Sequence, residues 1–347
     1  MSGTFLRLAG AAAVAAQAVL APVPCVAAPA PQRSVSQLLT DLQQLYRQTE
    51  QATETYNATA EKLQRQRARV SRLDGQLARA RLALQDSRAD AGRLARQQYQ
   101  SSTGLGPYVR LLLARDPQHA LDEGHVIGEL ARERARTVSR LTVTEQQKDA
   151  LARAARKALD TQLALADRQK KQRDHVRSRL GDVERLLASL TSGQLAAIAR
   201  LEQQGVARAQ QRLTTSGALG DRPASPAGDR AVRYAMAQLG KPYAWGAQGP
   251  SAYDCSGLTS RAWEHAGTPI PRTSQEQWQR LTRVPLKQLR PGDLVVYFPE
   301  ATHVAMYVGH GRVVQAPRPG ERVRISPLAS YPVLGAVRPD APAPRAR

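Results

Sequence analysis

Residues 63–94 read LQRQRARVSRLDGQLARARLALQDSRADAGRL, and their spacing is that of one long helix. The apolar positions advance by alternating steps of three and four, with polar residues at a few steps, and the same series runs back to Leu38. A 3.5-residue repeat kept over this length holds one seam toward a partner helix, which predicts a coiled coil. At ~1.5 Å per residue, roughly 65 residues would form a rod near 100 Å long. The apolar members are Leu38, Leu42, Leu45, Ala52, Tyr56, Leu63, Val70, Leu73, Leu77, Ala80, Leu84, Ala91 and Leu94.

A second long helix is predicted further along the chain. Glycine and proline at 101–107 end the first helix, and a short apolar segment at 108–114 follows. Helical periodicity then resumes over 126–213, with the clearest seam toward its end. Two long helices separated by one broken segment predict an antiparallel hairpin, with parallel dimerisation of each helix as the alternative. The late seam consists of Val176, Leu180, Val183, Leu187 and Leu190.

The composition divides the chain into a helical part and a compact part. The 347 residues are 42% hydrophobic but only 4% aromatic, which is too little large apolar volume for one core of that size. All three tryptophans lie in the last third. We therefore expect a helical coiled-coil region over 34–213, a flexible linker over 214–230 and a compact α+β domain over 231–339. A disordered tail over 340–347 is expected to follow.

The N-terminus is predicted to be a secretory signal over residues 1–28. Arg7 precedes an apolar run at 8–21, and small residues at 26–28 offer a cleavage site. The run is shorter than the ~20 residues needed to span a bilayer. The protein is therefore expected to be secreted, extracellular or associated with the cell wall. Cleavage would also remove Cys25, leaving Cys255 as a single thiol in an oxidising compartment.

The formal net charge of +21 has to be interpreted with this export in mind. In a cytosolic protein such a charge would indicate nucleic acid, whereas outside the membrane the available polyanions are wall polymers, peptidoglycan carboxylates and lipid headgroups. No nucleic-acid partner is therefore expected. The basic residues are spread along the helices, so a solvated helix face accounts for most of them.

Asp254-Cys255-Ser256-Gly257-Leu258 carries the strongest chemical signal. The motif follows a loop rich in glycine and proline and precedes a helical pattern, which places Cys255 at a helix N-terminus. Exposed N–H groups and the helix dipole there favour the thiolate, so we expect a lowered cysteine pKa and a nucleophilic role. An inert buried thiol and an intermolecular disulfide are the alternatives.

His303 is the best candidate for the base that such a cysteine needs. It opens an alternating strand, and a tight turn at His310-Gly311 returns the chain so that Gln315 comes close to His303. Gln315 could then orient the imidazole, which is the third role of a catalytic triad. A core histidine beside a buried thiol is the alternative interpretation of the same residues. No Cys-x-x-Cys or His-Glu-x-x-His spacing occurs, so neither a metal nor a cofactor is expected.

Five motifs in this region resemble the NlpC/p60 family of cell-wall cysteine peptidases. They occur in order over residues 231–339 and are specific as a set. The resemblance implies a papain-like α+β fold and hydrolysis of peptidoglycan stem peptides, usually at the bond between D-γ-glutamyl and a diamino acid. The motifs are Leu239-Gly240-Lys241-Pro242-Tyr243-Ala244-Trp245-Gly246, Asp254-Cys255-Ser256-Gly257-Leu258, Pro271-Arg272-Thr273-Ser274, Pro291-Gly292-Asp293-Leu294, and His303-Val304 through Gly309.

The resemblance also implies residue roles. Cys255 would be the nucleophile, His303 the general base and Gln315 the third polar residue. Tyr243 would line the site near the thiol, while Asp254 and Ser256 would help to bind the amino end of the substrate. The third position is most often histidine in this family, and a neutral glutamine preserves orientation better than charge. A wall-binding scaffold without activity, and a thiol amidase or transpeptidase on the same fold, are the competing functions.

The helical half resembles, less specifically, the coiled-coil regions of wall hydrolases that couple to division transport complexes of the FtsE–FtsX type. The apolar segment at 111–113 lies where those proteins dock; a plain spacer is the alternative. A linker of about 16 residues spans only ~20–24 Å, so the rod stays near the catalytic domain. We therefore hypothesise that the rod restrains the peptidase, and that a partner docking near 111–113 releases it.

Overall fold

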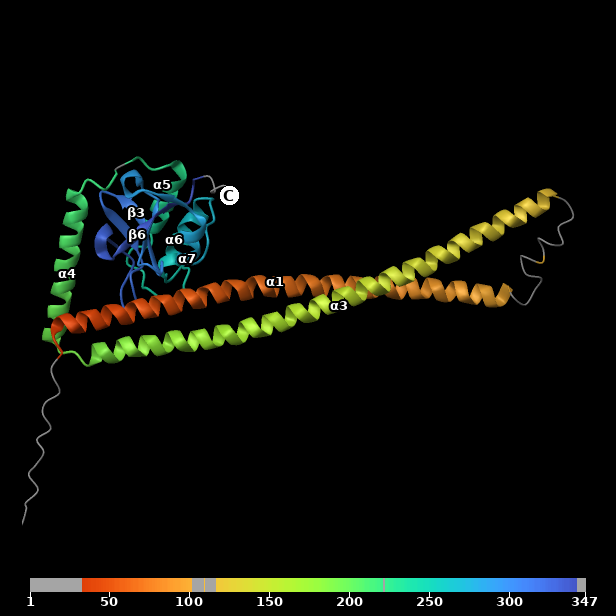
Figure 1. The fold of residues 1–347 in the computed structure, drawn as a ribbon, viewed down its shortest axis with the longest axis horizontal. Helices are drawn as coiled ribbons and strands as arrows, with labels where there is room; N and C mark the ends of the chain where they lie inside the picture. The colour runs from red at the N-terminus through yellow and green to blue at the C-terminus, as the bar shows by residue number, and fades with distance from the viewer. Residues whose placement is uncertain (1–32, 102–108, 110–116, 221, 342–347) are drawn as a thin grey trace, which may run out of the picture.

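The computed structural model describes residues 33–101, 109, 117–220 and 222–341. It consists of a long helical hairpin and a compact α+β domain that lies against the base of the hairpin (Figure 1). Among these described residues, no helix is long and apolar enough to cross a membrane. The predicted signal at 1–28 and the apolar segment at 111–113 lie outside the described residues.

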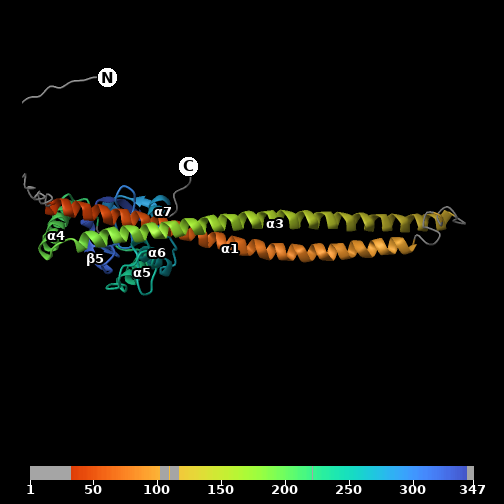
Figure 2. The ribbon, with the colours of Figure 1, turned by 90° about the horizontal axis from the view of Figure 1, so that it is seen from below.

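The hairpin is formed by α1 (Val35–Ser101) and α3 (Pro117–Ala188), which lie side by side and antiparallel (Figures 1 and 2). The first predicted helix is therefore confirmed, and the hairpin is found rather than the alternative of parallel pairing. The second predicted helix, 126–213, is wrong as one element. It is two helices, α3 and α4 (Ser192–Thr215), because the chain turns at 189–191 and Thr191 caps α4 with a reciprocal capping box to Gln194.

The base of the hairpin is a small three-helix core. Leu38 and Leu42 of α1 pack with Val183 of α3 and Ile198 of α4. From this base α4 turns away from the hairpin and runs along the side of the α+β domain (Figure 1). Gln210 fixes α4 to the domain, since its side chain donates to the carbonyl of Gly311 and accepts from the N–H of Ala329.

The segment predicted as a flexible linker, 214–230, is largely structured. Leu219 packs against the apolar core of the domain, and the N–H of Gly220 bonds to the carbonyl of Leu286. The next helix, α5 (Pro226–Met236), starts inside the predicted linker, because Ser225 caps it and proline is suited to its first turn. At the other end Asp340, placed in the predicted tail, pairs with Arg290 at 2.6 Å.

The domain contains one six-stranded antiparallel sheet in the order β1-β6-β2-β3-β4-β5. Helices α5 and α6 (Cys255–His265) pack with one face of the sheet, whereas Leu213 and Leu219 pack with the other. The strand predicted to open at His303 and the tight turn at His310-Gly311 are confirmed; the short helix α7 and strands β1, β5 and β6 were missed. The remaining bounds are α7 (Ser274–Arg280), β1 (Thr282–Val284), η1 (Leu286–Gln288), β2 (Leu294–Tyr297), β3 (His303–Gly309), β4 (Arg312–Gln315), β5 (Arg324–Pro327), η2 (Leu328–Ser330) and β6 (Val333–Arg338).

Candidate active site

Cys255 is the first residue of α6, as the sequence predicts. The side chain of Asp254 caps this helix by accepting from the N–H of Gly257 at 2.6 Å. Gly257 is required at this position, because a Cβ there would lie 2.2 Å from the carbonyl oxygen of Ala247. The cap and the close approach together fix the helix N-terminus against the loop that precedes it.

The sheet brings the base to the cysteine. The backbone N–H of Val304, the residue after His303, hydrogen-bonds the Cys255 sulfur. β3 and β4 pair antiparallel through a turn in which His310 and Gly311 both have positive φ. His303 Nε2 consequently lies 2.7 Å from Gln315 Oε1. The sequence-based expectation that Gln315 approaches His303 is confirmed.

This hydrogen bond selects the tautomer of His303. The Gln315 Oε1 atom is an acceptor, so Nε2 carries the proton and donates. In the neutral ring Nδ1 is then the unprotonated nitrogen that can accept a proton. Tyr331 packs edge-on against the ring at 5.0 Å and Tyr297 packs at 5.7 Å, which further fixes its plane.

The three residues expected to surround the thiol also lie at the site. Tyr243 is buried in the same cluster as Cys255, and burial raises the pKa of its phenol well above the usual value. Asp254 is fully buried and pairs with Arg272, whose two terminal nitrogens approach its oxygens at 3.0 and 2.7 Å. Arg272 also donates to Ser256 Oγ at 2.8 Å. Arg272 belongs to a motif visible in the sequence, but this clamp on Asp254 and Ser256 was not foreseen.

The site has an unexpected second wall, formed by α1. Glu50, Glu54 and Asn57 are spaced i, i+4 and i+7, so they form one stripe of the helix that faces the domain. They are 5%, 1% and 3% exposed, although a solvated rod would leave such side chains in water. We refer to Glu50, Glu54 and Asn57 as the α1 polar stripe.

Each member of the α1 polar stripe contacts a predicted site residue. Glu54 Oε1 accepts from Ser256 Oγ at 2.6 Å and from the Cys255 thiol at 3.6 Å. Glu54 Oε2 accepts from the backbone N–H of Ser274 at 3.1 Å.

The two other members contact the base and the helix cap. Glu50 Oε1 lies 3.1 Å from His303 Nδ1, the ring nitrogen that Gln315 leaves free. Asn57 donates to Asp254 Oδ2 at 3.0 Å. The α1 polar stripe therefore contacts Cys255 and His303, the predicted nucleophile and base, and both predicted substrate-binding polar residues.

These contacts reverse the expected pKa of the nucleophile. Burial, together with the Glu54, Asp254 and Glu50 carboxylates, raises the pKa of Cys255 well above its usual range. A helix N-terminus typically contributes only ~0.3–1 kcal/mol, whereas an uncompensated buried charge costs several. The prediction of a lowered cysteine pKa is therefore wrong for this arrangement, because α1 seals the thiol from water at 3% exposure.

The pKa values of His303 and of Glu54 are shifted as well. Burial lowers the pKa of His303, but the neighbouring Glu50 carboxylate outweighs it, so the pKa is raised above the usual value. Burial and the nearby Asp254 raise the pKa of Glu54 to about 7, against the lowering effect of Arg272. In this arrangement both shifts favour the protonated forms, the thiol of Cys255 and the imidazolium of His303.

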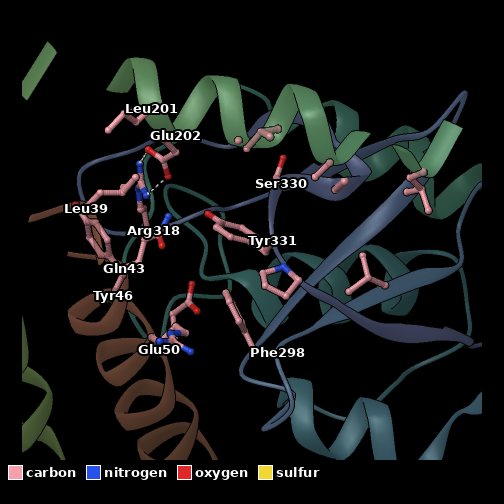
Figure 3. Close-up of a pocket in the computed structure, with 18 of the residues that line it drawn as sticks. Leu39, Gln43, Tyr46, Glu50, Leu201, Glu202, Phe298, Arg318, Ser330 and Tyr331 are labelled. Carbon is pink, nitrogen blue, oxygen red and sulfur yellow. Dashed lines mark hydrogen bonds and ion pairs between the residues drawn. The ribbon is translucent and has the colours of Figure 1, made fainter. Parts of the chain in front are cut away.

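A cavity of about 740 Å³ lies beside this covered site, between α1, α4 and the segment around η2. Figure 3 shows Glu50 and Tyr46 on the α1 side and Tyr331 and Phe298 on the domain side. Across it, Arg318 forms a bidentate pair with Glu202 of α4 at 2.9 and 3.1 Å. α1 is thus incompletely packed against the domain next to Glu50 and His303.

The covering residues could not be identified from their sequence pattern. Glu50 and Asn57 stand next to seam positions of the heptad series, and Glu54 lies between two of them; charged residues at such positions usually face water. Among the described residues, no group of three or more His, Cys, Asp or Glu side chains is arranged to hold a metal ion.

Known proteins support the assignment of this domain. Residues 240–334 match the NlpC/P60 family. A probable endopeptidase of Corynebacterium glutamicum is 44% identical over 116 residues, which cover 33% of this chain and 56% of that protein. The peptidoglycan endopeptidase RipA of Mycolicibacterium smegmatis is 37% identical over 111 residues, covering 28% of this chain and 22% of that protein.

Among solved structures, the NlpC/p60 domain of the peptidoglycan hydrolase SagA is 32% identical. It covers 32% of this chain and 97% of that one, with a TM-score of 0.30. The chain matches little more than half the length of the curated relatives, or less. The family match, residues 240–334, falls in the C-terminal third. The compact domain that carries Cys255, His303 and Gln315, at residues 240–334, is an NlpC/P60 family domain.

Proposed function

We propose that this protein is an exported peptidoglycan endopeptidase that cleaves stem peptides with a Cys255–His303–Gln315 triad. The observation that carries the proposal is the geometry of His303. Its Nε2 is fixed by Gln315 at 2.7 Å, and the Cys255 sulfur bonds to the N–H of the next residue, Val304. An imidazole with one nitrogen oriented and the other free to accept a proton is what a thiol nucleophile requires.

The reaction follows from these positions once the site is open. His303 Nδ1 takes the thiol proton of Cys255, and the sulfur attacks the carbonyl carbon of the scissile amide. The C–N bond then breaks, the amine leaves with the proton from His303, and a thioester remains. Water, activated by the same nitrogen, hydrolyses the thioester and regenerates the thiol.

The substrate assignment rests on the relatives named for peptidoglycan and on the polar groups beside the thiol. Asp254 and Ser256 hold hydrogen-bonding groups next to Cys255, and Arg272 keeps both in place. A carboxylate and a hydroxyl there suit the amino end of a short stem peptide. We propose the bond between D-γ-glutamyl and the diamino acid as the bond that is cleaved.

Digestion of purified muropeptides, followed by mass spectrometry, tests this function. Fragments that end in D-γ-glutamyl would support the endopeptidase. Release of the whole stem peptide from the sugar would instead identify an amidase, and joined stems a transpeptidase. Binding without any fragment, in a variant whose site is open, would identify a wall-binding scaffold.

Export and a membrane partner are further parts of the proposal. The apolar run at 8–21 and the small residues at 26–28 support a cleaved signal, since a wall substrate lies outside the membrane. A partner of the FtsE–FtsX type stays a prediction. Cell fractionation, with detection of the N-terminus of the mature chain, tests the export.

A further inference from the structure

The four groups that this chemistry uses are occupied by side chains of α1. Cys255 and Ser256 bond to Glu54, His303 Nδ1 lies against Glu50, and Asp254 bonds to Asn57. A substrate amide cannot reach the sulfur while the Glu54 carboxylate is 3.6 Å from it. The blockade is therefore steric at the nucleophile and at the substrate-binding groups alike.

The same contacts also oppose the proton transfer that starts the reaction. Glu50 lies at the only ring nitrogen of His303 that can receive the thiol proton. Its negative charge favours the protonated ring, and the Glu54 charge disfavours a thiolate at Cys255. α1 thus disables the site chemically as well as by covering it.

The contact between α1 and the domain is polar and incompletely packed. Beyond the α1 polar stripe, its clearest apolar contact is the edge-to-face pair of Tyr56 and Trp245, with ring centroids 5.0 Å apart. The 740 Å³ cavity adjoins Glu50, so this part of the interface lacks the close packing of a permanent core. Buried charged contacts of this kind gain little net stability because desolvation offsets them.

α1 can leave the site without giving up its hairpin partner. A different set of residues packs α1 on α3: Leu42 clusters with Val183, and Gln66 donates to the carbonyl of Ala158 at 2.7 Å. α4 remains bound to the domain independently through Gln210 and through the Arg318–Glu202 pair. The surface that blocks the site is therefore separable from the surfaces that hold the helices together.

We propose that α1 is a reversible autoinhibitory latch in which Glu50, Glu54 and Asn57 occupy the catalytic cleft and keep the enzyme latent until the helix is displaced. The proposal rests on the proposed function for its biological meaning. Its physical content, burial of the Cys255 thiol by α1, is independent of which bond the enzyme cleaves.

The alkylation rate of Cys255 by iodoacetamide tests the latch without any substrate. The full chain is used with Cys25→Ser, so that Cys255 is its one cysteine. Glu50→Lys with Glu54→Lys places two positive charges beside the Arg272 guanidinium and His303 and should expel α1. The matched control, Asp74→Lys with Asp86→Lys, makes the same charge change on exposed positions of α1.

We call the chain with Glu50→Lys and Glu54→Lys the latch variant, the chain with Asp74→Lys and Asp86→Lys the control variant, and the chain with Cys25→Ser alone the parent. We expect Cys255 of the latch variant to be alkylated at least tenfold faster than that of the parent, and the control variant to match the parent. Circular dichroism should show unchanged helix content in all three, because the hairpin contacts are untouched. Equal alkylation of parent and latch variant would overturn the latch. If the latch variant loses helix content, Asn57→Ala with Tyr56→Ala decides instead, since it removes contacts without adding charge. Fast alkylation without muropeptide cleavage would support the latch and refute the proposed function.

Discussion

Among single residues, Cys255 has the most clear-cut role, since the proposed chemistry has no other nucleophile. Cys255→Ala removes a sulfur that is 3% exposed and hardly changes the packing volume. We expect muropeptide cleavage to be abolished in a chain with an open site, while the thermal unfolding midpoint changes little. Activity within tenfold of the unsubstituted chain would rule out the thiol mechanism.

In the proposed mechanism Gln315 positions His303, so its removal should reduce activity only in part. Gln315→Ala removes the acceptor 2.7 Å from His303 Nε2 and lets the ring rotate away from the thiol. We expect a fall in kcat of about 10–100-fold, as for other groups that orient a catalytic ligand. Gln315→His should recover much of the rate, because it restores a hydrogen-bonding partner. Full activity in Gln315→Ala would mean that Tyr331 and Tyr297 alone hold the ring.

Individual site residues could be predicted from the sequence where a short-range pattern determines where the residue lies. The strand alternation around His303 and the tight turn at Gly311 are short-range features, so Gln315 was found from them. It failed for Glu50 and Glu54 because their partners lie more than 200 residues away, and a heptad register cannot indicate a tertiary partner. The wrong cysteine pKa follows from the same omission, since both carboxylates raise it.

At the scale of the helices and strands, the N-terminal turn of α6 has no room for a side chain at Gly257. Gly257→Ala would bring a Cβ to 2.2 Å from the Ala247 carbonyl oxygen and 2.8 Å from Asp254 Oδ1. Relieving such a clash costs about 1–3 kcal/mol, which lowers the melting temperature of a domain this size by roughly 5–15 °C.

Gly205 is a control that shows whether the lower melting temperature comes from the clash at Gly257. Gly205 lies in α4, and a Cβ there would have no atom within 4 Å. Gly205→Ala should leave the melting temperature unchanged or raise it, because alanine favours helix by up to about 1 kcal/mol. Differential scanning calorimetry of both variants makes the comparison, and equal melting temperatures would remove the packing argument for α6.

Helices with a strong hydrophobic repeat could be predicted from the sequence, whereas the residues at which they end were harder to predict. The heptad series located α1 because a sustained repeat is a long-range pattern within one helix. The break between α3 and α4 was missed because it contains no proline, although Thr191 and Gln194 form a capping-box pattern that is visible in the sequence. Strand β6 escaped notice because it lies in the middle of the sheet, with partners far away in sequence.

At the scale of the whole molecule, the packing of α4 and of the segment after it means that the effect of the helices on the domain cannot be tested simply by removing the helices. Leu213 and Leu219 pack against the apolar core of the domain, so a fragment that begins at residue 223 would lose these contacts. The three helices and the domain therefore form a connected assembly rather than a rod on a free tether. Substitution in α1 is the cleaner way to open the site.

The latch should weaken as the pH rises. Glu54 has a pKa of about 7 when docked and about 4.5 in water, so the docked state binds the proton more tightly. Its contribution is fully present below about pH 4.5 and is lost as the pH rises through about 7, a change of roughly 3 kcal/mol. The raised pKa values of Cys255 and His303 act in the same direction.

The pH dependence is measured as a ratio, so that the intrinsic chemistry of the thiol cancels. The ratio is the alkylation rate of Cys255 in the Glu50→Lys, Glu54→Lys variant divided by the rate in the parent. It should be largest near pH 5 and should fall toward pH 8. A ratio that grows with pH would show that ionised carboxylates strengthen docking, which is the reverse of the effect expected from the raised pKa of Glu54.

Turnover of one soluble muropeptide by the parent and by the Glu50→Lys, Glu54→Lys variant is the decisive comparison, because it combines the latch with the thiol chemistry. We expect at least tenfold faster cleavage by the variant, at the D-γ-glutamyl bond, and no cleavage when Cys255→Ala is added to it. A variant that cleaves no faster than the parent, or one that still cleaves without Cys255, would contradict a thiol peptidase held latent by its own first helix.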